Sequence, residues 1–461
     1  MRNVTLFAAP AFRWRTGVLR VSTWWLAVGG LTVLAFGLRL AWVFYTDAIP
    51  LGGDPHWYYT VGINIANGDG FVAARNEVWE VPGPGEPTAF WPPGYPFALG
   101  ATFWLFGSSV TAAQVLNAVI GALTVPLVFA LGARIFSRGV GLAAAGLVAV
   151  FPNVIAGTPV LFAEPLFTLI FTAALLALLS TSTDGERRWL PYLGVGFLIG
   201  LATLTRGQGV VLVPIAAAYW LMTSGWLPAS RATALALLAA TLVIAPWTVR
   251  NAVELHAFVP VSTNSSAVLR IGHFEGADGA VRWSDDEIDG FTMLQSVYRP
   301  EWEVRGYREY PRLAIGYALT HPGDEVVLSG KKVYHLYKSD IDVIPWLETL
   351  GATPLEPSWL EGVLRNVMDY AYYAMLFAAV GSTFLWARRG DADRSLLLVI
   401  VLFWTLFHIV LIGDPRYHQP LYPLFFISLA AGMSIAGPAL LRAIERIVAP
   451  RTAATDDAAA S

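Results

Sequence analysis

Long blocks of apolar residues separated by short polar segments organise this sequence of 461 residues. A helix needs about 20 apolar residues to cross roughly 30 Å of hydrocarbon, and only helices or closed barrels satisfy their backbone groups inside lipid. Because the blocks lack the alternating ten-residue pattern of a barrel, they predict helices. We expect about ten transmembrane helices, near 22–46, 111–133, 139–156, 162–180, 190–204, 210–223, 232–249, 364–387, 396–412 and 418–440.

The composition supports an all-α polytopic membrane protein. Only 14% of the residues are charged and 56% are hydrophobic, whereas a soluble chain carries about 25% charged residues. This composition excludes intrinsic disorder, which needs low hydrophobicity and high net charge. The absence of cysteine excludes disulfides and thiolate chemistry, and a net charge of −3 gives no reason to expect a nucleic-acid partner.

The distribution of basic residues predicts the orientation, because Lys and Arg concentrate on the cytoplasmic side. With a cytoplasmic N-terminus and ten spans, the cytoplasmic segments hold fifteen Lys and Arg against seven acidic residues. The C-terminus is then cytoplasmic too, in the inner (plasma) membrane. Counting 94–107 as a further span would reverse the later loops, so we interpret it as an interfacial or re-entrant helix.

This topology divides the chain into four parts. Residues 1–249 form an N-terminal transmembrane module with a large first outer loop at 47–110, and residues 250–363 form an extracytoplasmic region. Residues 364–440 return to the membrane, and 441–461 form a cytoplasmic tail that we expect to be disordered.

Asp54 is the first candidate for chemistry. It directly follows the first span and precedes Pro55, so it is a natural N-cap for a helix with Pro at its first position, stopping at Asn67-Gly68. A cap does not, however, need to lie within a few residues of the bilayer surface beside Tyr58. Both a structural cap and a chemical role are therefore open.

Several motifs together resemble one family. They are the D-x-x-x-Y of Asp54–Tyr58, N-G-D-G-F ending at Phe71, F-W-P-P-G-Y-P at 90–96, and related stretches at 151–167, 200–214, 259–279 and 413–424. This ordered set is similar to the GT-C glycosyltransferases, and within them to bacterial family 39, which includes protein mannosyltransferases and the lipid A aminoarabinose transferase. Each motif alone has little specificity, whereas their order across most of the chain is fairly specific.

The resemblance implies a GT-C-type helical bundle and an enzyme that moves one sugar from a polyprenyl-phosphate donor to an acceptor hydroxyl. The sugar would be a hexose or a pentose, and the acceptor a glycan, a lipid or a protein. In this family the first-loop Asp is the catalytic base, which assigns that role to Asp54. The phosphate leaving group needs no general acid, so a base for the acceptor hydroxyl and positive charge for the phosphate are what the protein must supply.

Three further charged residues are candidates for the same site. Glu164 lies alone in a short outer loop, where it either is simply solvated or caps a helix with Pro165, or else faces the cavity of Asp54. Arg206 and Arg416 lie in outer loops against the positive-inside bias, where they either snorkel to headgroups or bind lipid-linked phosphate. We also assign Tyr58, Tyr95 and Tyr417 to the site as substrate-binding residues. The aminoarabinose transferase has a Lys just before its Pro-Pro, and Trp91 occupies that place here, which shifts the phosphate to the two arginines.

The remaining polar residues receive simpler interpretations. We expect Arg39, inside the first span, to snorkel toward the surface, and His273, His321 and His335 to be ordinary polar residues without metal-like spacing. Two carboxylates at one site also leave a divalent cation open as a cofactor. The rival function is a flippase for a lipid-linked sugar without covalent chemistry. Against it, we find no inverted repeat and almost no ionisable residues at mid-membrane depth.

Overall fold

The structure is a computed structural model of the whole chain, and it describes residues 23–46, 52–72, 86–181, 189–282, 287–288, 291–292, 300–340, 343–349, 358–387 and 391–434. Within these residues the fold is helical, and the strands are limited to β1 (Glu287–Ile288) and β2 (Phe291–Thr292), which pair antiparallel. The expected all-α class is therefore confirmed. The acidic stretch at 285–289 lies largely outside the described residues, and the tail at 441–461 lies wholly outside them.

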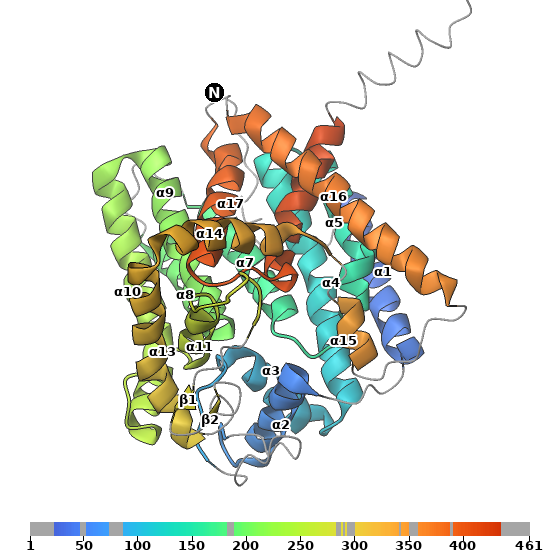
Figure 1. Cartoon of the computed structure of the whole chain (residues 1–461). Helices are drawn as coiled ribbons and strands as arrows, with labels where there is room; N and C mark the ends of the chain where they lie inside the picture. Colours follow the sequence, from blue (N-terminus) through green and yellow to red (C-terminus); the bar gives the residue numbers. More distant parts are fainter. Residues whose placement is uncertain are drawn as a thin grey trace, which may run out of the picture.

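Most of the long helices run side by side along one axis of the molecule, and α16 crosses them obliquely (Figure 1). Their bounds are α1 (Thr23–Thr46), α4 (Val110–Ile135), α5 (Arg138–Val150), α7 (Glu164–Leu179), α8 (Leu190–Thr205), α9 (Leu212–Ser224), α10 (Trp226–Glu254), α16 (Trp359–Ala387) and α17 (Ala392–Val410). A last helix covers residues 422–434. Each of the ten expected spans thus contains a helix.

Five membrane-spanning candidates in the described residues are both long and apolar enough to cross a bilayer: Thr23–Thr46, Val110–Ile135, Gly207–Ser224, Trp226–Glu254 and Ala392–Val410. The helices at 138–150, 164–179 and 190–205 are apolar but shorter. The chain is therefore a multi-pass membrane protein, whereas the count of ten spans stays a prediction.

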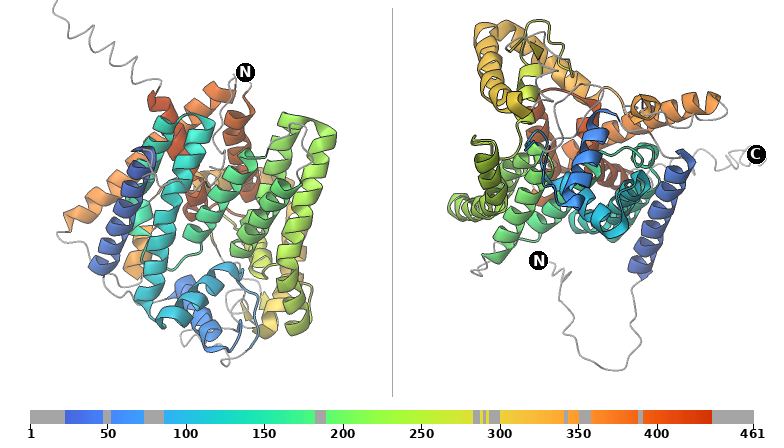
Figure 2. Two further views of the ribbon diagram at one scale, coloured as in Figure 1. Left: turned by 180° about the vertical axis from the view of Figure 1, so that it is seen from behind. Right: turned by 90° about the horizontal axis from the view of Figure 1, so that it is seen from below.

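Close backbone contacts hold the bundle together. A side-chain carbon on Gly141 of α5 would lie 2.4 Å from the Phe129 carbonyl oxygen of α4, and one on Gly196 of α8 would lie 2.2 Å from the Ala236 carbonyl oxygen of α10. Small residues at such crossings let membrane helices approach without bulky side chains between them. The pairs α4–α5 and α8–α10 therefore form two tightly packed parts on opposite sides of α7 (Figures 1 and 2).

One end of the bundle is closed by α2 (Gly53–Asn67) and α3 (Gly94–Phe106), and we call it the α2–α3 end. Seen from below, both helices lie across the centre of this end (Figure 2). The tips of Trp104 and Phe106 in α3 are exposed. This apolar exposure is what a helix lying in the membrane interface would present, and that placement of 94–107 stays a prediction.

The expected N-cap role of Asp54 is wrong. The helix α2 begins one residue before Asp54, at Gly53, and its N-cap residue is Gly52. Gly52 has an extended backbone, and no side chain makes a capping hydrogen bond there. Asp54 therefore lies in the first turn, where its carboxylate is available for other contacts. The expected stop is confirmed: Gly68 adopts φ +88°, and the amides of Gly68 and Asp69 donate to Ile65 and Asn64, which is a left-handed helix end suited to glycine.

The region between the α10 and α16 helices also packs on the bundle. It contains α11 (Asn264–Ile271), α13 (Pro300–Thr320), α14 (Pro322–Tyr337) and α15 (Val343–Thr349). The carboxylate of Glu303 in α13 is buried and accepts hydrogen bonds from the Thr88 hydroxyl, the Ala89 amide and the Thr263 hydroxyl. Helix α13 therefore starts at the α2–α3 end and is fixed to the first loop.

The expected snorkelling of Arg39 is wrong. Its side chain is 1% exposed and donates to the carbonyl oxygens of Ala35, Val148 and Ala149 at 3.0, 3.0 and 3.3 Å. Val148 and Ala149 belong to the last turn of α5, whose carbonyl groups have no partner within that helix. A positive charge at a helix C-terminus is favourable, so Arg39 fixes α1 to the end of α5.

This contact predicts a loss of stability when Arg39 is replaced. Arg39→Met keeps the length of the side chain but leaves the carbonyl oxygens of Val148 and Ala149 without this donor, which costs roughly 1–3 kcal/mol. We expect the midpoint of thermal unfolding in detergent to fall by several degrees. Arg231→Met, at an exposed arginine of α10, is the matched control, and equal midpoints for the two variants would contradict the assignment.

Candidate functional site

Four charged side chains from four separate segments meet beneath the α2–α3 end. Asp54 comes from the first turn of α2, Glu164 is the first residue of α7, Arg206 caps the C-terminus of α8, and Arg416 lies in the short helix η2 (Pro415–Leu421). Each therefore stands at the end of a helix, where the chain leaves the bundle. The sequence predicted this set, and the structure brings all four together.

The four groups form one continuous chain of ion pairs. Nη1 of Arg206 lies 2.6 Å from Oε1 of Glu164, and Nε of Arg416 lies 3.0 Å from the same oxygen. Nη1 of Arg416 lies 3.1 Å from Oδ2 of Asp54. Because two guanidinium groups face two carboxylates, the cluster is close to neutral and can be buried.

Glu164 is at the centre of this cluster. Its side chain is 2% exposed, so its interpretation as a solvated loop residue is wrong. Neither of its carboxylate oxygens has a donor with good hydrogen-bond geometry among the described residues, so its contacts with Arg206 and Arg416 are ion pairs. Glu164 therefore holds the two arginines by charge, with both of its oxygens buried.

Aromatic rings enclose the two guanidinium groups. The centre of the Arg206 guanidinium lies 5.4 Å from the Tyr417 ring centroid, and that of Arg416 lies 5.7 Å from Tyr417 and 4.7 Å from Phe162. These distances are within the range of cation–π attraction. The aromatic rings reduce the access of water, which strengthens the electrostatic interactions of the guanidinium groups that they surround.

The other expected aromatic residues form an adjoining group. Tyr58 packs edge-to-face on Tyr95 at 5.2 Å between ring centroids and lies 5.7 Å from Trp91. The hydroxyl of Tyr95 donates to Oδ1 of Asn117 at 3.0 Å. Tyr58 and Tyr417 thus border the charge cluster, whereas Tyr95 supports Tyr58 from behind.

Burial and charge together set the protonation of the site. Burial disfavours the charged form of Arg416, but the negative charges of Glu164 and Asp54 outweigh it and raise the pKa of Arg416 well above its ordinary value. Burial raises the pKa of Asp414, against the opposing effect of Arg416. The Arg416 guanidinium therefore keeps its positive charge.

Sequence reasoning missed the residues that hold the Arg416 loop. Oδ1 of Asp414 accepts from the Arg416 amide, and the Trp404 indole donates to the Tyr417 carbonyl oxygen. The buried ring of His418 contacts the Leu336 carbonyl oxygen through Nδ1 and Oδ1 of Asp340 through Nε2. The R-Y-H-Q motif contained His418, but its partners lie about 80 residues earlier in the chain.

A second missed group supports Arg206. Its Nε donates to Oε1 of Gln208 at 2.9 Å, and Nε2 of Gln208 lies 3.2 Å from Nε2 of His408 in α17.

His273, which we expected to be an ordinary polar residue, is instead buried, with Nδ1 at 2.9 Å from Oε1 of Glu325 and Nε2 at 3.1 Å from Nζ of Lys332. The polar supports thus come from segments that local patterns cannot relate to one another.

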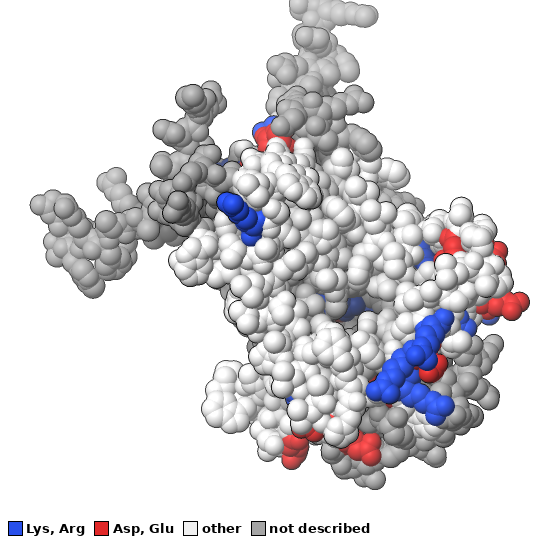
Figure 3. Space-filling model, turned by 90° about the vertical axis from the view of Figure 1, so that its left-hand side faces the viewer, with Lys and Arg blue, Asp and Glu red and all other residues white. Residues whose placement is uncertain are grey.

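A cleft of about 600 Å³ opens beside the cluster. Arg206, Tyr58 and Tyr417 line it together with Trp91, and its remaining wall comes mainly from α11, α13 and the C-terminal end of α17. Figure 3 shows a hollow with basic side chains at its floor. Asp54 does not line this cleft; it adjoins it through Arg416.

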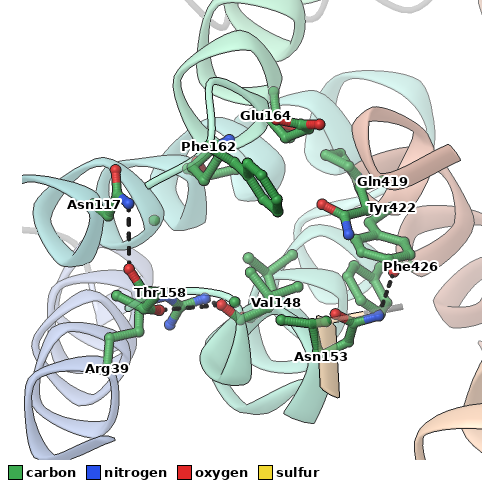
Figure 4. A pocket seen from close by; sticks show the side chains of 18 residues that line it. Arg39, Asn117, Val148, Asn153, Thr158, Phe162, Glu164, Gln419, Tyr422 and Phe426 are labelled. Carbon is green, nitrogen blue, oxygen red and sulfur yellow. Dashed lines mark hydrogen bonds between the residues drawn. The ribbon is translucent and has the colours of Figure 1, made fainter. Parts of the chain in front are cut away.

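A smaller cavity of about 70 Å³ lies on the opposite side of Glu164. Figure 4 shows Glu164 and Phe162 facing Arg39 and Asn153 across it. Its volume suits a few water molecules at most. Glu164 therefore lines the small cavity, whereas its partner Arg206 lines the cleft.

The carboxylates of Asp54 and Glu164 left a divalent cation open as a cofactor. Among the residues that the structure describes, no group of three or more His, Asp or Glu side chains is placed to hold a metal ion. Asp54 and Glu164 both face arginines.

Comparisons with known proteins agree with this architecture. The archaeal oligosaccharyltransferase AglB from Archaeoglobus fulgidus, in complex with an inhibitory peptide and a dolichol-phosphate, matches 93% of the chain at 15% identity and a TM-score of 0.52. The chain covers 52% of that protein. ArnT from Cupriavidus metallidurans in the apo state matches 93% of the chain at 15% identity and a TM-score of 0.51, with 66% of ArnT covered.

These matches define the class of the fold: the chain is folded like AglB and ArnT. Residues 91–249, about a third of the chain, match the family model of dolichyl-phosphate-mannose-protein mannosyltransferase. No curated protein sequence matches the chain. The resemblance predicted from the sequence motifs is thus confirmed, and the matched segment carries Glu164 and Arg206.

The shared carboxylate predicts strong coupling between Glu164 and Arg206. Glu164→Gln leaves two buried guanidinium groups without their common partner, and breaking a buried ion pair costs on the order of 3–5 kcal/mol. In the double variant with Arg206→Gln, we expect part of this loss to be recovered, because one unpaired charge is gone. Thermal unfolding of the two single variants and the double variant measures the coupling; strictly additive losses would show that the pair is not energetically linked.

Proposed function

We propose that this protein is a membrane glycosyltransferase that moves a single sugar from a polyprenyl-phosphate donor to an acceptor hydroxyl. The observation that carries the proposal is the cluster of Arg206 and Arg416 on Glu164 and Asp54, beside a cleft that Arg206 lines. The GT-C fold and the family model that describes dolichyl-phosphate-mannose as donor support it.

The arginines would bind the donor phosphate. Arg206 lines the cleft, so an anion in the cleft would contact it first. Arg416 lies next to it, because both arginines contact the same oxygen of Glu164. Guanidinium groups stay charged and can hold phosphate oxygens in pairs. Glu164 occupies the position between the two arginines, and its charge keeps them together until a phosphate replaces part of that contact.

This arrangement supports the following transfer step. As Arg416 turns toward the phosphate, Asp54 loses its partner and becomes free to accept a proton. The acceptor oxygen forms a bond to the anomeric carbon while the bond from that carbon to the phosphate oxygen breaks, with inversion at the carbon. The acceptor proton passes to Asp54, and the phosphate leaves as an anion stabilised by the arginines.

The orientation is part of the proposal. The α2–α3 end would face the extracytoplasmic side of the plasma membrane and both termini the cytoplasm, as the positive-inside distribution indicates. Residues 250–363 would then shape the acceptor side, since α11 and α13 form one wall of the cleft. Tyr58 and Tyr417 would bind the substrates at the edge of the charged groups.

The first prediction separates transfer from translocation. Asp54→Asn removes the base while keeping the size of the side chain, and general-base catalysis contributes roughly 10²–10⁴-fold. With a radiolabelled polyprenyl-phosphate sugar in proteoliposomes and an envelope extract as acceptor source, we expect the variant to bind the donor and to release polyprenyl phosphate at least about 100-fold more slowly.

The control for this assay is Asp69→Asn, at an exposed residue of the same loop, which should transfer normally. Normal turnover of Asp54→Asn would remove Asp54 from the mechanism. Label that crosses the bilayer in the wild type without release of polyprenyl phosphate would instead establish the flippase.

The second prediction concerns the phosphate. Arg206→Lys and Arg416→Lys keep the charge but lose the paired donors, so the KM for the donor should rise roughly 10- to 100-fold, the range expected for losing a charge-assisted hydrogen bond. Arg138→Lys, at an exposed arginine, is the matched control. An unchanged donor KM in both site variants would exclude the arginines from phosphate binding.

A further inference from the structure

The helical hairpin of α13 and α14 carries an exposed stripe of side chains that changes from basic to apolar along the chain. On α13, Arg305, Arg308 and Arg312 follow one another at spacings of three and four residues, and all three are exposed. The same spacings continue through Ile315 and Leu319, which are also exposed. Residues at such intervals lie on one face of a helix, so this stripe is basic at its start and apolar at its end.

The neighbouring turn extends the apolar part. Val326 and Val327, in the first turns of α14, are 75% and 56% exposed, and Leu319 is 77% exposed. If this extracytoplasmic hairpin were surrounded by water, such a cluster of exposed large apolar side chains would be unfavourable. The apolar end of the hairpin therefore needs an apolar environment.

The position of the hairpin indicates which environment this is. Helix α13 starts at the α2–α3 end, where Glu303 binds Thr88 and Ala89, and it rises along the bundle toward α14 (Figure 1). Nζ of the buried Lys332 in α14 donates to the Ile409 carbonyl oxygen in the last turn of the spanning candidate α17. The apolar turn thus lies near the level of a helix end that belongs to the membrane.

The basic part of the stripe lies beside the cleft. Tyr307 and Pro311 of the same helix line the cleft, and Figure 3 shows a band of basic side chains next to the hollow. The guanidinium of Arg305 lies 5.6 Å from the Trp302 ring, and Arg312 lies 3.4 Å from Glu309 in a pair that is largely exposed. An exposed pair of this kind contributes little, so Glu309 does not cancel the positive band.

We infer that the α13–α14 hairpin is inserted in the bilayer leaflet on the α2–α3 side, with Ile315, Leu319, Val326 and Val327 among the acyl chains and the three arginines on anionic phospholipid headgroups. Arginines at the headgroup level above apolar residues match the polarity gradient of the leaflet. The anionic partner is the phospholipid of the protein's own membrane. Resting on the proposed function, the inference also places the cleft mouth at the headgroup level, where a polyprenyl-phosphate donor moves.

Lipid-borne quenching tests the insertion directly. The chain has no cysteine, so Leu319→Cys and Val326→Cys each carry one environment-sensitive dye, and Glu86→Cys, at an exposed residue of the first loop, is the control. In nanodiscs with acyl-brominated phosphatidylcholine, dyes at 319 and 326 should be quenched and the dye at 86 should not. Unquenched dyes at 319 and 326 would overturn the insertion.

A second arm tests the arginines. Acyl-brominated phosphatidylglycerol at the same mole fraction should quench the dye at 319 about twofold or more strongly than the phosphatidylcholine, because each basic residue near the surface attracts anionic lipid. Arg305→Gln/Arg308→Gln/Arg312→Gln should make the two lipids equal, whereas Arg282→Gln, at an exposed arginine outside α13, should not. Equal quenching in the wild type would overturn the role of the arginines. Neither arm needs catalytic activity, so failure here is distinct from failure of the proposed transferase.

Discussion

The contact of Arg206 and Arg416 with a single oxygen of Glu164 is the interaction on which the site depends. Charges beside the apolar part of a membrane protein are tolerated only when they are paired or open to water. Pairing two guanidinium groups on one carboxylate, with Asp54 as a second partner of Arg416, satisfies this constraint at 10% exposure or less for both arginines. The ends of α2, α7, α8 and the Arg416 loop must therefore meet.

The same constraint gives the site its chemistry. A carboxylate between two arginines resembles a bound phosphate in charge, so the resting site is organised for an anion before any substrate arrives. The carboxylates of Glu164 and of the partly exposed Asp54 are the acceptors of this arrangement. Binding of a phosphate would replace the ion pair between Arg416 and Asp54 by one between Arg416 and the phosphate. Asp54 would then change from an ion-pair partner to a proton acceptor.

The helices and the charged residues of the site could be predicted from the sequence because their signals are local. Apolar blocks indicate helices wherever they occur, and Arg206 and Arg416 were conspicuous because they oppose the positive-inside distribution. The errors concern partners. Arg39 was expected to snorkel because its acceptors, Val148 and Ala149, lie about 110 residues away. Asp54 was expected to cap α2, but Gly52 does so. The support of Arg416 by His418 and Asp340, and the arginine stripe of α13, likewise depend on tertiary packing.

A structure of the protein in a nanodisc with bound polyprenyl phosphate tests the central claim most directly. The account predicts that the phosphate lies in the cleft within hydrogen-bond distance of both Arg206 and Arg416, and that the 3.1 Å contact between Arg416 and Asp54 is broken. A phosphate bound elsewhere, with the four charged side chains paired as they are in its absence, would contradict the account.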